Sequence, residues 1–250
     1  MKNLSLVFIL ALLAIPALRP AEDGAPRSLT AAQIVEQNIS ARGGLAAWRA
    51  VDSMTIVGKI ALGKSDPQVS FVLNVKRPRK ARIEVRFNGE TAIHLYDGQN
   101  AWKLMPFLDR YEVEPYPSQE MNEAPAGLDL DGPLMDYEAK GAFLELEGMD
   151  KVEDREAYRL RLTTKDGTVR HIWVDAQTFL DAKVDATPRR FNGQLHSMAT
   201  YYRDYKLVQG LMIPHLFETV LEGVTQTEKV TIESVAINPK LDDKLFTKPE

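Results

Sequence analysis

The stretch ARIEVRFNGETAIHLY, residues 81–96, decides the fold class of this chain. Before the Asn-Gly pair at 88–89, apolar side chains alternate with charged ones, which is the pattern of a strand with one buried face. An Asn-Gly pair favours a two-residue hairpin loop, because both residues readily adopt the positive φ that this loop requires. We therefore expect an antiparallel hairpin in which Ile83 pairs with His94, so that His94 lies on the apolar face.

The Asp-Gly pair at 166–167 predicts a second hairpin of the same kind. Counting outward from a two-residue loop pairs Leu162 with His171 and Leu160 with Trp173. Both His171 and Trp173 are thereby expected on the apolar face.

Further turn pairs stand at 97–98 and 192–193, and the loop length at 97–98 stays open, so Trp102 is not assigned to a face. Strands are also expected near 54–62 and 69–75, and then at 143–147, 157–164, 168–175, 179–186, 195–207, 212–221 and 225–237. About eleven strands without recurring helices exclude a parallel βαβ architecture. The sequence therefore predicts a mainly β, antiparallel domain with a few helices.

One helix is expected before the strands. Thr30 and Gln33 form a capping-box pattern, apolar residues follow at helical spacing, and the glycines at 43–44 end the run. A short second helix is expected to extend through Trp48.

Residues 106–141 interrupt the strand pattern with five prolines and many acidic residues. Large apolar residues are also frequent there, which is not typical of a disordered linker. We expect an irregular, partly helical excursion. The acid pair Asp129 and Asp131 within it is expected on the solvated surface.

The N-terminal segment is typical of a secretory signal peptide. A basic start is followed by an apolar run over residues 4–15 that is too short to span a bilayer. Cleavage is expected after Ala17 or Ala21, so residues 1–21 are assigned to the signal and residues 22–250 to a single domain. The chain has no cysteine, which excludes a lipid-anchoring cysteine, and its net charge of −4 argues against nucleic-acid binding.

No motif of a hydrolase, nucleotide-binding loop or metal site is present, and the four histidines are scattered at positions 94, 171, 196 and 215. We therefore expect no catalytic residue, no metal and no cofactor. A histidine on an apolar face is either a wall residue of the core or a polar contact to the head group of a ligand.

Several stretches together resemble one protein family. They are VKRPRKARIEVRF at 75–87, YDGQNAWKLMPF at 96–107, LDGPLMDYEAKG at 130–141, DYKLVQGLMIPH at 204–215 and DDKLFTKP near the C-terminal end. In order and spacing they resemble the outer-membrane lipoprotein-sorting proteins, relatives of the periplasmic carrier LolA. The chain and its excursion are longer than in the short carriers of that family.

The resemblance implies an unclosed antiparallel half-barrel whose concave side is covered by a helical lid, with an apolar cavity that takes up acyl chains. By match to the Lys-Arg-Pro stretch, Arg77 would hold the lid shut, and the alternative is a surface arginine at a strand end. Residues 106–141 would supply the lid or the rim. The candidate cavity residues are Phe71, Leu73, Ile83, Val85, Phe87, His94, Tyr96, Leu134, Met135, Tyr137, Tyr158, Leu160, Leu162, His171 and Trp173.

The function implied is a periplasmic carrier of the acyl chains of lipoproteins or lipids, delivered toward the outer membrane. Its partners would be an inner-membrane exporter and an outer-membrane acceptor. A sensor or scaffold that detects stray lipid with the same cavity is the alternative. A secreted hydrolase of lipid-like substrates is disfavoured because no activated nucleophile can be assembled from a motif.

Overall fold

The computed structural model describes residues 29–62, 67–117, 130–191, 193–224 and 227–249. Thirteen strands in these residues form one antiparallel sheet, in the order β6-β5-β4-β3-β2-β1-β13-β12-β11-β10-β9-β8-β7. The strands are β1 (Ser53–Leu62), β2 (Val69–Lys76), β3 (Lys80–Phe87), β4 (Glu90–Tyr96), β5 (Ala101–Met105), β6 (Arg110–Pro115), β7 (Phe143–Val152), β8 (Arg155–Thr163), β9 (Val169–Asp175), β10 (Asp181–Phe191), β11 (Gln194–Val208), β12 (Leu211–Leu221) and β13 (Thr227–Ile237).

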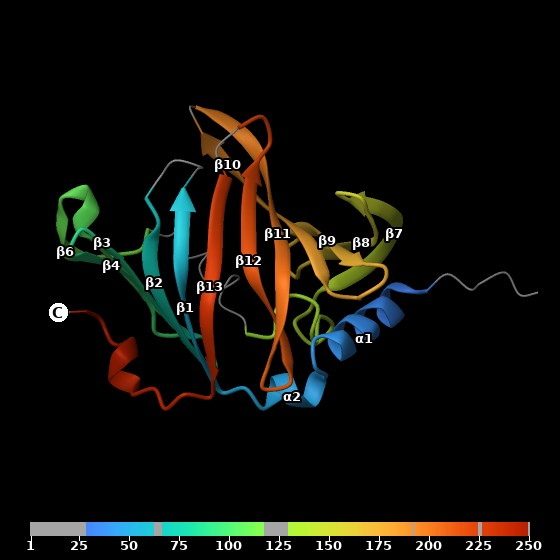
Figure 1. Cartoon of the computed structure of the whole chain (residues 1–250), viewed down its shortest axis with the longest axis horizontal. Coiled ribbons are helices and arrows are strands. Elements are labelled where there is room, and N and C mark those ends of the chain that lie inside the picture. Colours follow the sequence, from blue (N-terminus) through green and yellow to red (C-terminus); the bar gives the residue numbers. More distant parts are fainter. Residues whose placement is uncertain (1–28, 63–66, 118–129, 192, 225–226, 250) are drawn as a thin grey trace, which may run out of the picture.

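The sheet is a pair of meanders joined where β1 pairs with β13, and its outermost strands β6 and β7 do not meet (Figure 1). The predicted mainly β, unclosed antiparallel architecture is therefore confirmed. The strand count exceeds the expected eleven, in part because the Pro-rich excursion contains β6 in addition to the 3-10 helix η1 (Pro106–Leu108). Residues 118–129 of the excursion lie outside the described residues, as does the predicted signal segment 1–21.

The first helix, α1 (Ala31–Ala41), begins as the sequence predicts. Thr30 Oγ1 accepts a hydrogen bond from the backbone N–H of Gln33, and Gln33 Oε1 accepts one from the backbone N–H of Thr30. This capping box satisfies two of the backbone donors that a helix start leaves without partners. The second predicted helix is α2 (Leu45–Arg49), which contains Trp48. Among the described residues, no helix combines the length and apolar character needed to cross a membrane.

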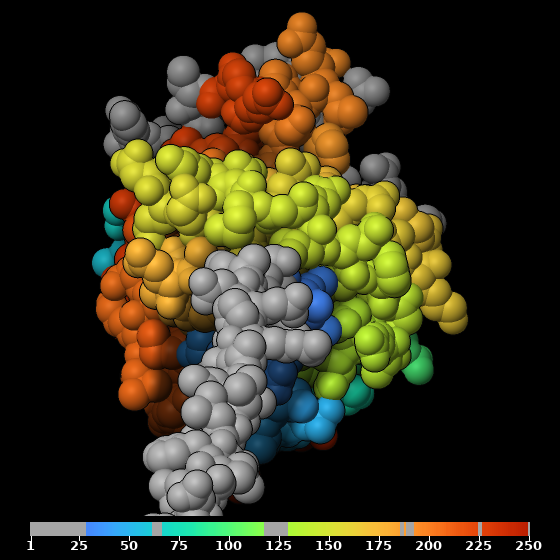
Figure 2. Space-filling view, turned by 90° about the vertical axis from the view of Figure 1, so that its right-hand side faces the viewer, coloured from blue at the N-terminus to red at the C-terminus, as the bar shows by residue number. Residues whose placement is uncertain are grey.

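The larger hydrophobic core lies between α1 and strands β7 to β10. Ile34 and Val35 of α1 pack there against the inner faces of β8 and β9. Figure 2 shows α1, in blue, beside the yellow-green surface of residues near 130–150. The fully or nearly buried members are Ile34, Val35, Leu134, Leu144, Leu160, Leu162, Ile172 and Val174.

A second core fixes α2 against the middle of the sheet. It contains Trp48, Val51, Met54, Met135, Leu211 and Ile213. The indole N–H of Trp48 donates to the backbone oxygen of Arg42 at 3.0 Å, so the buried ring has its polar group satisfied. The two helices thus lie on one face of the sheet, which we call the inner face.

The hairpin at 88–89 has the predicted register. Ile83 pairs with His94 and Ala81 with Tyr96, and both loop residues have positive φ. At the far edge, β7 carries a register irregularity between Leu146 and Gly148. On the outer face, the C-terminal 3-10 helix η3 (Asp243–Phe246) packs against β3 and buries Phe246.

Candidate functional site: an apolar pocket and a latch

An apolar pocket of about 470 Å³ opens on the inner face, at the end of the sheet where β1 leads toward β2. Its lining residues are Ile60, Pro67, Val69, Val85, Phe87, Phe107 and Glu228. All but Glu228 are apolar, and the carboxylate of Glu228 is the one charged group among them. A cavity of this composition can exclude water from an alkyl chain while one polar group stays at its wall.

The period of the strands places these side chains together. Ile60 pairs with Val69 on neighbouring strands, and Phe71 pairs with Val85, so alternate residues point to one face. Phe71 is 4% exposed and lies over Gly58, where an added Cβ would come within 3 Å of its ring. A Cβ at this position would also clash with the backbone oxygen of Thr231, so glycine is what allows the Phe71 ring to pack here.

Phe107 reaches the pocket from η1. This short helix follows β5. The ring of Phe107 contacts the ring of Phe87 edge-on, with the two ring centroids 6.0 Å apart. Edge-to-face contact is a favoured geometry for aromatic pairs. The wall thus joins a predicted residue, Phe87, with one that the strand pattern could not indicate, because Phe107 lies in the irregular segment.

Arg77, at the end of β2, holds the helices and the segment 130–141 to the sheet. Its guanidinium donates to both carboxylate oxygens of Asp131, with Nη1 at 2.9 Å from Oδ2. It also donates to the backbone oxygens of Val51 and Trp48, at 2.6 and 3.1 Å. One side chain therefore ties together β2, the end of α2 and the segment 130–141.

Asp131 is the main anionic partner of this latch. The Arg77 guanidinium lowers the pKa of the Asp131 carboxyl below its ordinary value, so the pair stays ionised over a wide range of pH. The Asp131 side chain is only 16% exposed. The prediction that Asp131 belongs to a solvated surface pair is wrong, since charge patterning along the chain cannot reveal that an arginine 54 residues away covers it.

Hydrophobic anchors complete the attachment of the segment 130–141, which we call the lid segment. Leu134 and Met135 are 1% and 0% exposed and insert into the two separate cores. Arg42 donates to the backbone oxygen of Asp131 at 3.2 Å, and Arg49 pairs with Asp136 at 2.8 Å. The lid segment is therefore held by buried apolar groups as well as by charges.

The other predicted cavity residues of β2 to β4 share the inner face. Leu73 pairs with Ile83, and both are half-buried, as is His94. The Nδ1 atom of His94 lies 2.5 Å from the hydroxyl oxygen of Tyr116. Tyr96 is buried and donates to the backbone oxygen of Gly98.

A further group of predicted cavity residues lies beneath α1. Leu160 and Leu162 are 0% and 2% exposed inside the larger core, and Tyr137 packs at its margin. Tyr158 lies there too, stacked on Phe179 with centroids 5.9 Å apart. At this end of the inner face, helix and sheet pack against each other directly.

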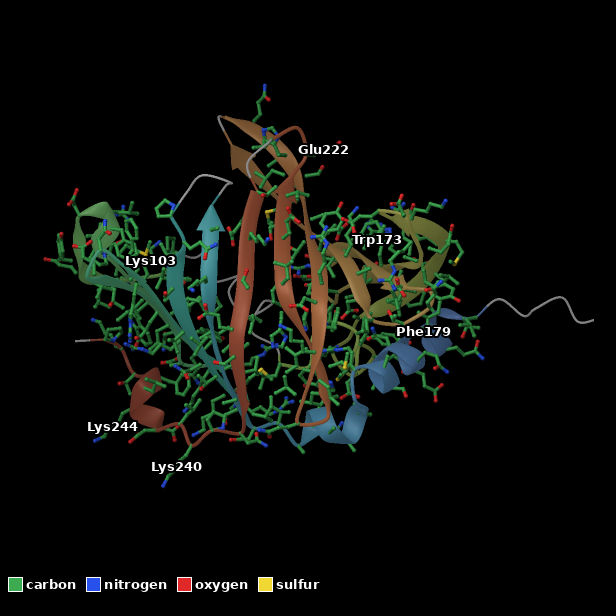
Figure 3. The ribbon with its side chains drawn as sticks, in the orientation of Figure 1. Lys103, Trp173, Phe179, Glu222, Lys240 and Lys244 are labelled. Atoms are coloured by element: carbon green, nitrogen blue, oxygen red, sulfur yellow. The ribbon has the colours of Figure 1, made fainter. Side chains whose placement is uncertain are left out.

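His171 and Trp173 lie on the other face, contrary to prediction. Leu162 pairs with Arg170 and Leu160 with Ile172, one residue away from the expected partners. The hairpin has a five-residue loop, 164–168, closed by two hydrogen bonds between the backbones of Thr164 and Thr168 and of Gly167 and Thr164. Figure 3 shows Trp173 on the side of the sheet away from α1 and Phe179 near the helix.

On that outer face His171 and Trp173 join a network of charged groups. His171 Nδ1 is 2.7 Å from Asp185, and the Trp173 indole N–H donates to Asp150 at 2.8 Å. Trp102, which the sequence did not assign to a face, also lies on the outer face, because it pairs with Leu95 on the side opposite His94. None of the described residues forms a group of three or more ligands suited to a metal ion.

No family model matches this chain, and no curated protein matches it. Several solved structures resemble it over most of its length. A LolA superfamily protein from Nitrosomonas europaea has a TM-score of 0.60 and 18% identity, covering 88% of this chain and 99% of that one. A putative outer membrane lipoprotein-sorting protein domain from Vibrio parahaemolyticus has a TM-score of 0.59 and 12% identity, covering 86% and 95%.

A DUF1329 family protein from Desulfovibrio piger has a TM-score of 0.59 and 14% identity, covering 87% of this chain and 97% of that one. Each likeness extends over nearly the whole of the similar chain, so the match concerns the complete domain rather than a shared hairpin. The chain therefore has the LolA-like fold of the lipoprotein-sorting proteins.

Proposed function

We propose that this protein is a carrier that takes up acyl chains of lipids or lipoproteins in the apolar pocket of its inner face. The observation that carries the proposal is the pocket itself, about 470 Å³ with six apolar residues among its seven lining residues. The LolA-like fold supports it, because the similar proteins include a lipoprotein-sorting domain. The cavity candidates of β2 and β3, above all Val85 and Phe87, would contact the chain.

The energy of uptake needs no catalytic group. Burying an alkyl chain stabilises the complex by roughly 0.8 kcal/mol per CH₂, so a chain of about fourteen carbons gains on the order of 10 kcal/mol before ordering costs. Cargo bound this firmly leaves slowly unless the protein alternates between two states. In the proposal, Arg77 and the lid segment set the balance between those states.

The proposal extends to the cellular setting. Residues 1–21 would direct export, residues 22–250 would form the carrier domain in the periplasm, and delivery would run from an inner-membrane exporter to an outer-membrane acceptor. No nucleic acid and no cofactor takes part in this scheme.

Binding can be tested with the chain purified from the periplasm. Lipid that copurifies is identified by mass spectrometry, and a fluorescent fatty acid is titrated into delipidated protein. We expect one acyl chain to bind in an apolar environment. Protein that carries no lipid and leaves the probe in water would refute the carrier function.

A matched pair of variants localises the site. Phe87→Glu places a charge in the pocket wall and is expected to weaken probe binding at least tenfold, because an unpaired carboxylate would meet the alkyl chain. Leu207→Glu places the same charge on β11, where Leu207 is 69% exposed, and is expected to leave binding unchanged. If both variants had equal effects on probe binding, the acyl chain would bind elsewhere on the protein.

A further inference from the structure

A second cavity, of about 480 Å³, lies where β10 and β11 part. Its apolar wall includes Val152, Ala157 and Ala182, and the small core that these residues form with Trp173 faces away from α1. We call this cavity the slot. The residues that matter for its chemistry are Asp181, Ala182, Tyr201, Tyr202, Tyr205 and Arg203.

The slot exists because the pairing of two neighbouring strands stops early. The first pair between β10 and β11 is Lys183 with Tyr201, and the register of β10 against β9 is irregular between Asp181 and Lys183. Beyond Tyr201 the strand β11 continues with β12 alone as its partner. A hydrogen bond spans the opening between the two strands: the Tyr205 hydroxyl donates to the backbone oxygen of Asp181 at 3.0 Å.

The carboxylate of Asp181, which can accept further hydrogen bonds, lies at the base of the slot. Asp181 Oδ1 accepts one hydrogen bond from Asn38 Nδ2 at 3.2 Å, and among the described residues no donor reaches Oδ2. Asn38 behind it is 0% exposed, and its Oδ1 also has no partner within the described part of the chain. Burial raises the pKa of Asp181, with the charge of Arg42 opposing this, so a nearby positive charge would stabilise the carboxylate.

Two tyrosines, Tyr202 and Tyr205, lie close to this carboxylate. Burial, and next to it the charge of Asp181, raises the pKa of Tyr202 to about 12, and the same two causes raise the pKa of Tyr205. The rings of Tyr202 and Phe217 pack edge to face, with their centroids 5.2 Å apart. Within the described residues, no group of the protein hydrogen-bonds to the Tyr202 hydroxyl.

The arginines of the slot are already paired, so the slot does not favour an anion. Arg155 lies 2.7 Å from Asp175, and Arg203 lies 2.6 Å from Glu218 while it also pairs with Glu153. Four acidic residues and two arginines occur among the lining residues, which leaves an excess of negative charge. The Tyr201 ring already faces two cations of the protein, since Lys183 Nζ lies 5.6 Å and Arg203 Cζ 5.1 Å from its centroid. The rings of Tyr202 and Tyr205 and the Asp181 carboxylate are together the recognition chemistry of an alkylated ammonium group.

We propose that the slot binds a small organic cation, with its ammonium group against Asp181 and its carbon substituents against the rings of Tyr202 and Tyr205. The cation is either a free amine or the head group of a lipid, which have this chemistry in common. The site is separate from the apolar pocket, and the proposal does not depend on the carrier function.

Choline is a suitable probe, because a neutral isostere exists in which a tert-butyl group replaces the trimethylammonium group. Both compounds are titrated into the intact chain and followed by NMR shifts and by the rise in Tm that binding produces. We expect choline to bind at least tenfold more tightly than the isostere. Equal binding of the two, or binding of neither, would overturn the proposal.

Variants then assign the interaction to the slot. Asp181→Asn keeps the shape of the side chain and removes its charge, and it is expected to weaken choline binding at least tenfold. Ala182→Leu fills the slot and provides a second test if Asp181→Asn does not fold. Glu222→Gln removes a carboxylate at an exposed turn that does not line the slot, and this variant should bind like the parent chain. If all three variants bind choline equally, the cation does not bind in the slot.

The source of the cation is identified by competition. Short-chain phosphatidylcholine that displaces choline, where phosphatidylglycerol does not, assigns the slot to a lipid head group. Choline binding that neither lipid displaces assigns it to a free amine. Displacement by both lipids alike would show that the slot recognises alkyl chains and not the ammonium group, which would overturn the proposal.

Discussion

Replacing Arg77 with leucine tests the latch, because it removes the hydrogen bonds of Arg77 while the hydrophobic cores stay unchanged. In the structure the Arg77 guanidinium makes two hydrogen bonds to Asp131 and one each to the backbone oxygens of Val51 and Trp48. A hydrogen bond to a charged group contributes about 1.5–3 kcal/mol, but the pair is 29% and 16% exposed and therefore partly screened. We expect Arg77→Leu to weaken lid closure by about 2–3 kcal/mol in total, a factor of roughly 30 to 150 in the ratio of closed to open states.

Release of cargo measures this shift. Protein loaded with a fluorescent fatty acid is mixed with acceptor vesicles in a stopped-flow instrument, and we expect release from Arg77→Leu to be at least tenfold faster than from the parent chain. The free energy of unfolding should fall by less than the closure energy, because the open state of the proposed carrier is itself folded. Asp131→Asn should accelerate release as well, and the double variant should add little to either change.

Arg79→Leu is the matched control. Arg79 stands two residues further along the chain, is exposed, and makes no ion pair with any described residue. Its replacement removes the same charge and adds the same apolar group without touching the latch. Release that is equally fast from Arg77→Leu and Arg79→Leu, or unchanged in both, would refute the latch.

Three other predictions concern stability. Leu160→Ala should lower the free energy of unfolding by about 2–5 kcal/mol in denaturant titrations, because Leu160 is 0% exposed beneath α1, whereas Leu207→Ala should change it by less than about 0.5 kcal/mol. Gly89→Ala should cost about 1–2 kcal/mol in the same assay even though nothing lies within 4 Å of an added Cβ, because its φ of 83° is unfavourable for residues with a Cβ; an unchanged midpoint would contradict the type of loop. Because the pKa of Asp131 is lowered, the ionised Asp131 stabilises the attachment of the lid segment fully at pH values above the ordinary pKa of 3.8, and this stabilisation is lost as the pH falls through the lowered pKa. The acid unfolding transition of Arg77→Leu should therefore lie at a higher pH than that of the parent chain. Identical acid transitions would argue against the coupling of Arg77 to Asp131.

The hairpins show how far sequence alone predicts this fold. At 88–89 the alternating pattern leaves one register that buries Ile83 and Val85 together, and the two-residue loop agrees with it. At 166–167 the same turn signal belongs to a longer loop, where Asp166 Oδ1 accepts hydrogen bonds from the Thr168 backbone N–H and the Thr164 hydroxyl. Because a shift of one residue in the register moves every side chain of a strand to the opposite face, the predicted two-residue loop put His171 and Trp173 on the wrong face.

The candidate site was predictable in part, for a physical reason. A period of two identifies side chains that share one face, but it does not tell which of them a helix covers. Leu160 and Val85 have the same strand pattern, yet α1 packs on the first and the second lines the pocket. Asp181 and Asp131 were not recognised, because their partners Asn38 and Arg77 are distant in sequence and carry no local signal.

The open sheet also has a consequence for self-association. A sheet whose first and last strands do not meet presents two rows of backbone hydrogen-bonding groups that could recruit the strand of another molecule. At one border β6 is only six residues long and ends at Pro115, which lacks an amide hydrogen. At the other, the irregularity at Leu146 and Gly148 interrupts the straight run that a neighbouring copy would need. Both borders thus disfavour polymerisation through added strands, so the half-barrel can remain open without becoming a template for fibres.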